Sequence, residues 1–477
     1  MLIPSLDAFV YGTSLKSSKV PKIADALQTK TYQVDQVEHS FVQVVSQNEV
    51  ENPEETLPSP PQSENSVTFA GSPSRSQSLS WIPPVYVTLL DHFLVRMTRS
   101  ISCHKGIQAE FCSFLLPMAL ETPHLLAAVL LSAAMHRSSV GLEQSVAQIN
   151  HLRAASLTQL RRSLTADGAV IEETTMATAL LLCLAEVHSG EDNIEAMKVH
   201  LQGARALWKS AWGLKKKSSA WIFFRRFYTS LESIALSYGM LQTQSDDLTS
   251  CEPEEEDYID DLAGFSTALL PTFDEINHLV NATRQVPGIT LNPVVHDAFI
   301  KETCEILVAK VENLLLIREP RFSPSAKNIL SPRVQFDLFT LDEAHHHMAL
   351  LQLYCRISSE VSQNRIQQSV STIIACINRM SFVDEPCPCI AILPPLFIAG
   401  CHAKDYYDRY AVMSLLEKST TFFAMGNVKL ARRTLKELWE ARDRLEDEGD
   451  GESTKWQDLI GKSMRGGSNG GMAIASY

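Results

Sequence analysis

The sequence lacks several features that mark large classes of protein. No cysteine precedes Cys103, and the ten cysteines of the 477 residues follow no regular spacing. This usage favours free buried thiols in a reducing compartment over a disulfide framework. The longest apolar runs, 125–135 and 176–187, are too short to span a bilayer. The first residues also lack the basic start and apolar stretch of a secretory signal, so we expect a soluble intracellular protein.

Positive charge is scarce as well. The chain has 42 Lys and Arg against 55 Asp and Glu, which gives a net charge of −13. Affinity for nucleic acid comes from clustered Lys and Arg, so this balance argues against a general phosphate-binding surface. Catalytic motifs are missing too: there is no nucleophile elbow, phosphate loop, zinc-protease helix or dinucleotide fingerprint. We therefore expect no enzyme, no catalytic residue and no cofactor.

What the sequence does contain is helical periodicity. Leu89, Phe93 and Met97 recur at spacings that place them on one face of a helix. Thr122 and Pro123 are suited to the N-cap and first turn of the helix through 125–135. No segment shows the sustained alternation of a strand, so we predict an all-α fold. Further helices are expected at about 151–164, 172–188, 194–212, 221–240, 263–280, 293–316, 341–359, 366–380, 403–424 and 428–445.

Composition divides the chain into three parts. Residues 1–80 are rich in Ser and Pro over their second half, and such a segment buries too little apolar area to offset its ordering entropy. We expect most of this region to be disordered. Residues 81–445 should form one large multi-helix domain. Residues 446–477 are first acidic and then rich in Gly and Ser, and they should form a short disordered tail.

The most distinctive stretch is 393–403, with the sequence LPPLFIAGCHA. We interpret this apolar run, broken by two prolines and closed by Gly-Cys, as a packed turn that leads into a helix. It resembles the late signature of the fungal-specific transcription factor domain, the helical regulatory half of fungal zinc-cluster activators. Three other stretches resemble that family in order and spacing, so that the resemblance covers about residues 85–445: 200–207 (HLQGARAL), 262–279 with its Gly-x-Ser, and 349–356 (ALLQLYCR).

This resemblance implies a nuclear regulator of transcription that controls a metabolic or biosynthetic gene set, with secondary metabolism the favoured case. The expected partners are the transcription machinery or another DNA-binding regulator, and a homodimer is a further expectation. The expected mechanism is conformational: helices bind a partner, and a small effector in an apolar cavity between them is a further option. Residues around Phe397, Cys401, Tyr406 and Trp439 are then expected to be packing elements.

The sequence departs from that family in one respect. Its activators carry a six-cysteine module that binds two zinc ions and places a helix in the major groove. No such cysteine pattern occurs in this sequence, so direct DNA binding and the zinc cofactor do not carry over. Three explanations stay open: a regulator that acts through protein partners, a truncated product of a zinc-cluster activator, or a domain that serves as a scaffold or ligand-sensing module.

One basic cluster is a candidate site. A nuclear-import signal or phosphate contact competes with a solvated loop between helices as its explanation, and neither is favoured. The residues of this candidate import cluster are Lys215, Lys216, Lys217, Arg225 and Arg226.

Three other groups of polar residues receive no site assignment. The histidines at 345–347 diverge by about 100° each on a helix, and we expect them on a solvated or half-buried polar face. Cys387 and Cys389, followed by Cys401, are too closely spaced for a structural zinc site, so we expect buried thiols at a proline-rich turn. The mixed acidic and apolar run 252–261 is interpreted as an exposed loop in preference to an activation segment. No metal site is therefore predicted.

Overall fold

The computed structural model describes residues 82–166, 171–189, 194–211, 218–237, 257–283, 293–323, 326–357 and 360–447. Over these ranges the secondary structure is helical, apart from two isolated β-bridges, both of which involve Ile259. The all-α prediction is confirmed. Residues 1–80 and most of the predicted tail lie outside the described residues, and the last described helix ends at Asp447, two residues past the predicted domain boundary.

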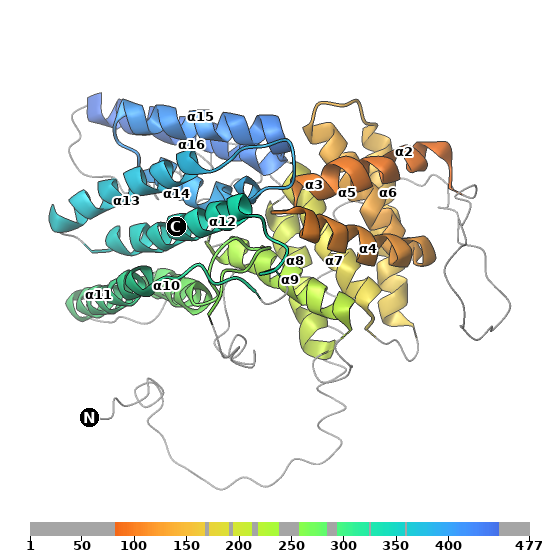
Figure 1. Ribbon diagram of the computed structural model, residues 1–477, viewed down its shortest axis with the longest axis horizontal. Helices are drawn as coiled ribbons and strands as arrows, with labels where there is room; N and C mark the ends of the chain where they lie inside the picture. Colours follow the sequence, from red (N-terminus) through yellow and green to blue (C-terminus); the bar gives the residue numbers. More distant parts are fainter. Residues whose placement is uncertain are drawn as a thin grey trace, which may run out of the picture.

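The helices form two halves that lie side by side (Figure 1). The N-terminal half contains α2 (Pro84–His92), the π-helical turn η3 (Phe93–Met97), α3 (Thr98–Ser100), α4 (Lys105–Glu121), α5 (Pro123–Ser139), α6 (Val146–Thr165), α7 (Glu173–Ser189), α8 (Ile194–Ala211) and α9 (Ser219–Ser237). The C-terminal half contains α10 (Leu269–Thr283), α11 (Pro293–Ile317), α12 (Pro332–Tyr354), α13 (Glu360–Arg379), the 3₁₀ turn η4 (Pro388–Ala391), α14 (Leu393–His402), α15 (Tyr406–Phe423) and α16 (Gly426–Asp447).

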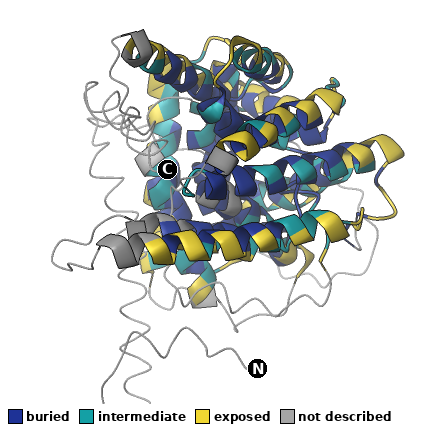
Figure 2. Cartoon of the chain, turned by 90° about the vertical axis from the view of Figure 1, so that its left-hand side faces the viewer, coloured by how far each residue is buried: buried dark blue, intermediate teal, exposed yellow. Residues whose placement is uncertain are grey.

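Each half is built around helices that are buried on nearly every side. In the N-terminal half these are α5 and α7, and in the C-terminal half it is α12. A helix that is apolar all round belongs in the middle of a bundle, and the amphipathic α6, α8 and α13 cover these central helices. Buried positions accordingly line the inner faces of the helices, and exposed positions gather on the outermost ones (Figure 2).

Helix starts follow local capping chemistry where the sequence supplies it. Thr122 is extended at the N-cap of α5 and Pro123 opens its first turn, as predicted. The helix predicted at 341–359 begins at Pro332, nine residues earlier, because the Ser331 hydroxyl caps it by accepting a hydrogen bond from the Val334 amide at 3.4 Å. Its end lies at Tyr354.

The interpretation of 393–403 as a turn is wrong, because these residues form a helix of their own, α14. Prolines are tolerated in the first turn of a helix, where an amide would have no partner. Gly400 lies inside α14 and lets α16 approach closely: a methyl group at this position would lie 2.7 Å from Leu435 Cδ1. The indole of Trp439 donates a hydrogen bond of 3.0 Å to the Gly400 carbonyl. The following helix, α15, starts separately after the N-cap Asp405.

Candidate functional site

The two halves meet at the segment 257–266, which precedes α10. The helix predicted from 263 does not begin until Leu269, because Gly264 has φ +86° and closes a turn. The carboxylate of Asp260 accepts hydrogen bonds of 2.8 Å from the amides of Leu262 and Ala263, which fixes that turn. The turn places the next carboxylate, Asp261, between the halves.

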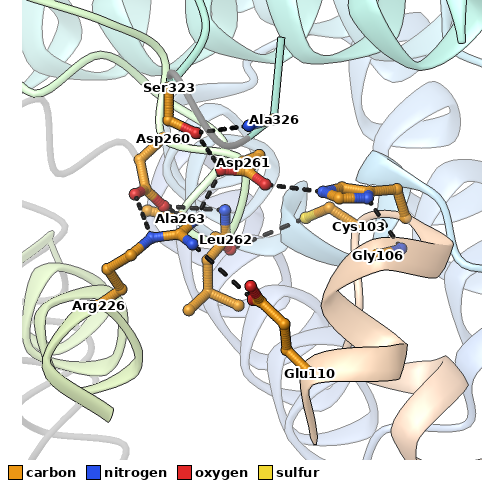
Figure 3. Close-up of polar contacts among 11 residues, drawn as sticks. Cys103, Gly106, Glu110, Arg226, Asp260, Asp261, Leu262, Ala263, Ser323 and Ala326 are labelled. Atoms are coloured by element: carbon orange, nitrogen blue, oxygen red, sulfur yellow. Dashed lines mark hydrogen bonds and ion pairs between the residues drawn. The ribbon is translucent and has the colours of Figure 1, made fainter. Parts of the chain in front are cut away.

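Asp261 is only 2% exposed and contacts three other chain segments (Figure 3). Its Oδ2 lies 2.7 Å from Nε2 of His104, the residue that caps α4. Its Oδ1 accepts a hydrogen bond of 2.6 Å from Arg226 Nη2 on α9 and one of 3.1 Å from the Ser323 hydroxyl. Because His104 Nδ1 accepts a hydrogen bond from the Gly106 amide, Nε2 carries the proton and donates it to Asp261.

We call Asp261 and its partners His104, Arg226 and Ser323 the junction network. The neighbouring charges and hydrogen bonds explain why Asp261 is ionised. Burial opposes ionisation of Asp261, but the hydrogen bond from His104 and the charge of Arg226 outweigh it and hold the pKa of Asp261 below its usual value. Arg226 also bonds Asp260 through Nε at 3.3 Å, and its Nη1 lies 3.9 Å from Glu110. Burial is the main reason why the pKa of Glu110 is raised. The Arg226 guanidinium, on a helix of the N-terminal half, therefore balances the negative charges of Asp260 and Asp261 in the segment that leads into the C-terminal half.

A second buried network lies on the other side of the same turn. Asp342 on α12 accepts a hydrogen bond of 2.8 Å from the Ser266 amide, and Arg318 Nη1 lies 3.4 Å from its Oδ2. Burial raises the pKa of Asp342. The Arg318 guanidinium carbon lies 3.9 Å from the ring centre of Phe339, and its other nitrogen bonds Glu343 at 3.0 Å. The turn is thus held by a charged network on each of its two sides.

Three buried histidines form a further contact between the halves. His92 Nε2 lies 2.8 Å from His136 Nδ1, and His136 Nε2 lies 3.4 Å from the carbonyl of Phe423 at the end of α15. The ring of His188 packs edge-on against His136, with 5.1 Å between the centres. Burial lowers the pKa of His92 and of His136 to about 4, so both rings are neutral at physiological pH. Close by, Lys429 donates to the carbonyl of Ser139 at 2.6 Å.

The junction network does not have the order of groups that nucleophilic catalysis requires. Asp261 lies between His104 and Ser323, whereas activation of a serine requires the histidine between serine and carboxylate. Within the described ranges, no three His, Cys, Asp or Glu side chains are grouped so that they could hold a metal ion. The network instead fixes the relative position of α4, α9, α10 and the chain before α12.

The candidate import cluster is divided by the structure. Lys215, Lys216 and Lys217 lie outside the described residues. Arg225 is half-buried, with its guanidinium carbon 6.0 Å from the ring centre of Trp208. Arg226 is committed to the junction network, and its side chain is only 17% exposed. Its role in that network could not be read from the sequence, because its partners lie about 35 residues and more than 100 residues away.

Two expectations for polar residues are wrong in part. His345 and His346 are 2% and 1% exposed, so they belong to the core of the C-terminal half, whereas His347 is half-buried as expected. His345 bonds the Leu341 carbonyl at 3.0 Å and packs on Phe265. The run 252–261 is not an exposed loop over its described part, since Ile259 and Asp261 are buried. The apolar residues Tyr258 and Ile259 within this acidic run were the sequence signal for its burial.

The cysteine prediction is confirmed. Cys387, Cys389 and Cys401 are buried free thiols, the first two at the 3₁₀ turn η4. The Cys355 sulfur lies 3.4 Å from Nε2 of His402, so the thiol directly after α12 contacts the last residue of α14.

Comparison with known protein families shows to which family the chain belongs. A family model described as the fungal-specific transcription factor domain matches residues 88–467. The chain belongs to this family. Neither the search of curated proteins nor the search of solved structures gives a match. The family resemblance found in the sequence is thereby confirmed, and the two-halved helical body described above is this chain's fungal-specific transcription factor domain.

Membership supports a coarse functional statement. The chain is a fungal transcription regulator by family, and domains of this family are generally non-enzymatic and nuclear. Among the described helices, none has both the length and the apolar character needed to cross a bilayer.

Proposed function

We infer that the chain acts in the nucleus and controls transcription of a metabolic or biosynthetic gene set, with secondary metabolism the favoured case. The observation that carries this proposal is the family match over 88–467, which includes the whole described helical body from α4 to α16. The junction network connects helices of both halves and lacks the order of groups that nucleophilic catalysis requires. A regulatory role is therefore favoured over an enzymatic one.

The mechanism we propose is conformational. The segment 257–266 is held by Asp261 on one side and by Asp342 on the other, so a displacement of either half changes the contacts of both. A partner or a small effector that favours one arrangement of the halves shifts the population toward it. Charged groups at the junction favour a few distinct arrangements of the two halves over intermediate ones, because a buried charge separated from its partner is strongly disfavoured.

The expected partners are proteins. The net charge of −13 argues against a general phosphate-binding surface on this chain, so we propose that it works with another DNA-binding regulator or with the transcription machinery. Nuclear entry is assigned to Lys215, Lys216 and Lys217 with Arg225. Arg226 is left out of this signal because its guanidinium is bound inside the molecule.

Localisation and transcripts together test the proposal. A fluorescently tagged chain should accumulate in the nucleus, and deletion of its gene should change the transcripts of a coherent metabolic gene set. Replacing Lys215, Lys216 and Lys217 by alanine should move the protein to the cytoplasm and reproduce the transcript change. A control removes the same charge elsewhere, at Lys301, Lys327 and Lys436, which are exposed and lie on other elements.

Two outcomes distinguish the alternatives. Cytoplasmic protein with unchanged transcripts on deletion would contradict the proposal and favour a scaffold or ligand-sensing module. Direct, sequence-specific binding of the purified chain to DNA would contradict the assignment of DNA contact to a partner.

A further inference from the structure

Two of the buried thiols are close neighbours both in the sequence and in the structure. Cys387 and Cys389 are separated by one residue, Pro388, and both side chains are buried at the 3₁₀ turn η4. They are the only two of the ten cysteines with this spacing. The turn η4 borders the place where the two halves meet, because Ala391 lies 3.4 Å from the position that a methyl group on Gly264 would take.

The backbone places the two sulfurs within reach of each other. Cys387 is extended, with φ −150° and ψ 154°, and Pro388 opens the 3₁₀ turn. Two Cα atoms on either side of a helical residue are about 5–5.5 Å apart, which lies inside the range of roughly 4.4–6.8 Å that a disulfide bridges. The two thiols are hydrogen-bonded to each other. A bond between the sulfurs therefore needs little movement of the backbone.

This hydrogen bond makes the two thiols unequal. It lowers the pKa of the Cys387 thiol and outweighs the burial that acts in the opposite direction. The same bond is the main reason why the pKa of Cys389 is raised, with burial as the second. The thiolate is the nucleophilic form of cysteine, so Cys387 is the thiol that reacts first.

A buried carboxyl group close to the pair has one oxygen without a partner. Asp337 on α12 is 0% exposed, and its charge acts on both thiols. Its Oδ1 accepts a hydrogen bond of 3.1 Å from the Ser381 amide, whereas its Oδ2 has no hydrogen-bond partner among the described residues. Such buried, unpartnered polar atoms are rare in native structures. Burial raises the pKa of Asp337, so this carboxyl group can take up the proton that Cys387 releases.

We propose that Cys387 and Cys389 form a reversible oxidation site for hydroperoxides. The Cys387 sulfur attacks the O–O bond, so that an S–O bond forms, the O–O bond breaks and the peroxide leaves as an alcohol or water with the Cys387 proton. The Cys389 sulfur then attacks the sulfenic acid at Cys387: an S–S bond forms, the S–O bond breaks and the hydroxyl group leaves with the Cys389 proton as water. The thiol pair loses two electrons, and the peroxide gains them.

Small oxidants reach Cys387 by a local opening of the segment that precedes it. Asp384 and Glu385 are exposed and connect this segment to the N-terminal half, through Arg99 at 2.7 Å and Lys105 at 3.3 Å. Exposed ion pairs of this kind contribute about 0–1 kcal/mol each. These charged contacts therefore oppose an opening only weakly, and a local opening admits a molecule as small as hydrogen peroxide.

A disulfide at this site is suited to reversal. The stabilisation that a disulfide contributes grows with the length of chain that it closes, and this one spans a single intervening residue. Disulfides that are easily reduced are typical of regulatory sites and not of structural ones. Both cysteines are free thiols in the structure, which is the reduced state of the proposed site.

Peptide mapping of the full chain in its native state tests the site. The reduced protein is treated with hydrogen peroxide, alkylated under denaturing conditions and digested with chymotrypsin, which cuts at Leu393 and Phe397 and so separates the pair from Cys401. The peptide with Cys387 and Cys389 should lose two hydrogens about tenfold or more faster than any other thiol of the chain is oxidised. Dithiothreitol should restore it.

Single replacements identify the order of the steps. Cys389→Ser removes the thiol that resolves the sulfenic acid, so dimedone should label Cys387 strongly in this variant and only weakly in the wild type. Cys387→Ser should give neither the disulfide nor the label. The matched control is Cys304→Ser on α11, which removes a buried thiol of the same half and should leave the oxidation at η4 unchanged. Thermal melts should show that all three variants are folded.

Three results would each overturn the proposal. The first is that Cys387 and Cys389 stay reduced while other thiols of the native chain react. The second is a disulfide between Cys387 and Cys103, the thiol of the N-terminal half on which the charge of Cys387 also acts. The third is dimedone labelling of Cys389 in the Cys387→Ser chain at the rate expected for Cys387. None of these results depends on whether the chain regulates transcription.

Discussion

At the scale of single residues, Asp261 is the most consequential side chain of the described structure. It is the shared partner of Arg226, His104 and Ser323, and it is buried. Asp261→Asn keeps the shape but removes one of the two carboxylate charges that bond Arg226, and Asp260 remains as the other. Breaking a buried pair from one side costs about 3–5 kcal/mol, and because Asp260 still pairs with Arg226 we expect a loss toward the lower end of that range in the free energy of unfolding. Urea denaturation at neutral pH measures it.

A matched control separates burial from mere charge loss. Asp384 also pairs with an arginine, Arg99, at 2.7 Å, but its side chain is 75% exposed. Asp384→Asn should change the free energy of unfolding by less than about 1 kcal/mol, because water screens this pair. Equal costs for the two variants would show that the junction network is not tighter than an ordinary surface pair.

At the scale of elements, α14 depends on a glycine. Gly400→Ala adds a methyl group that would lie 2.7 Å from Leu435 Cδ1 and 3.1 Å from Val412 Cγ1. The gain in helix propensity is about 1 kcal/mol, but overpacking against α15 and α16 costs about 1–3 kcal/mol. We expect a net destabilisation in thermal and chemical denaturation.

Removal of the opposing side chain checks the cause. Leu435→Ala alone creates a cavity and destabilises the protein, but in that background Gly400→Ala should cost less than in the wild type, or nothing. Additive effects of the two changes would contradict a direct clash between α14 and α16.

The elements show what the sequence determines locally and what it does not. The Thr122-Pro123 start of α5 was predictable because its signal lies within a few residues. The α14 helix was missed because two prolines and a glycine suggest a turn unless the first-turn position and the packing against Leu435 are known. The start of α10 was predicted too early, since helical periodicity continues through the Gly264 turn.

The site was less predictable than the fold for a related reason. Asp261 and His104 are separated by 157 residues, so no local pattern connects them. The same holds for Arg226, which sequence spacing associated with neighbouring lysines although its partners are carboxylates of other elements. Burial of His345 and His346 also follows from the position of α12 at the centre of its half.

At the scale of the whole molecule, buried histidines should make stability depend steeply on pH. Burial lowers the pKa of these rings below the value of about 6.5 that they have in the unfolded chain. The unfolded state therefore binds more protons than the folded state as pH falls below that value, and the free energy of unfolding decreases. The pKa is about 4 for His92, His124, His136 and His345, about 3 for His200 and His402, and well below its usual value for His188.

Five carboxyl groups act in the opposite sense. Burial raises the pKa of Glu110, Glu232, Asp337, Asp342 and Asp408, so the folded state binds protons there that the unfolded state releases. Acidification strengthens folding through these groups, over a window that begins above their ordinary values near 4. Burial also lowers the pKa of His347, so eight described histidines oppose five carboxyl groups, and the histidines begin to act at higher pH. The net effect of acid down to about pH 5 is therefore loss of stability.

Denaturant unfolding at several pH values between 7.5 and 4.5 measures this balance. Stability should be nearly constant above pH 7 and should fall below pH 6.5, with each buried histidine contributing up to about 1.4 kcal/mol per pH unit. His124→Gln should lower the proton uptake on unfolding at pH 5.5 by about one proton, because His124 is neutral when folded and charged when unfolded. Stability that stays flat or rises between pH 6.5 and 5 would contradict the assignment of neutral histidines to the core.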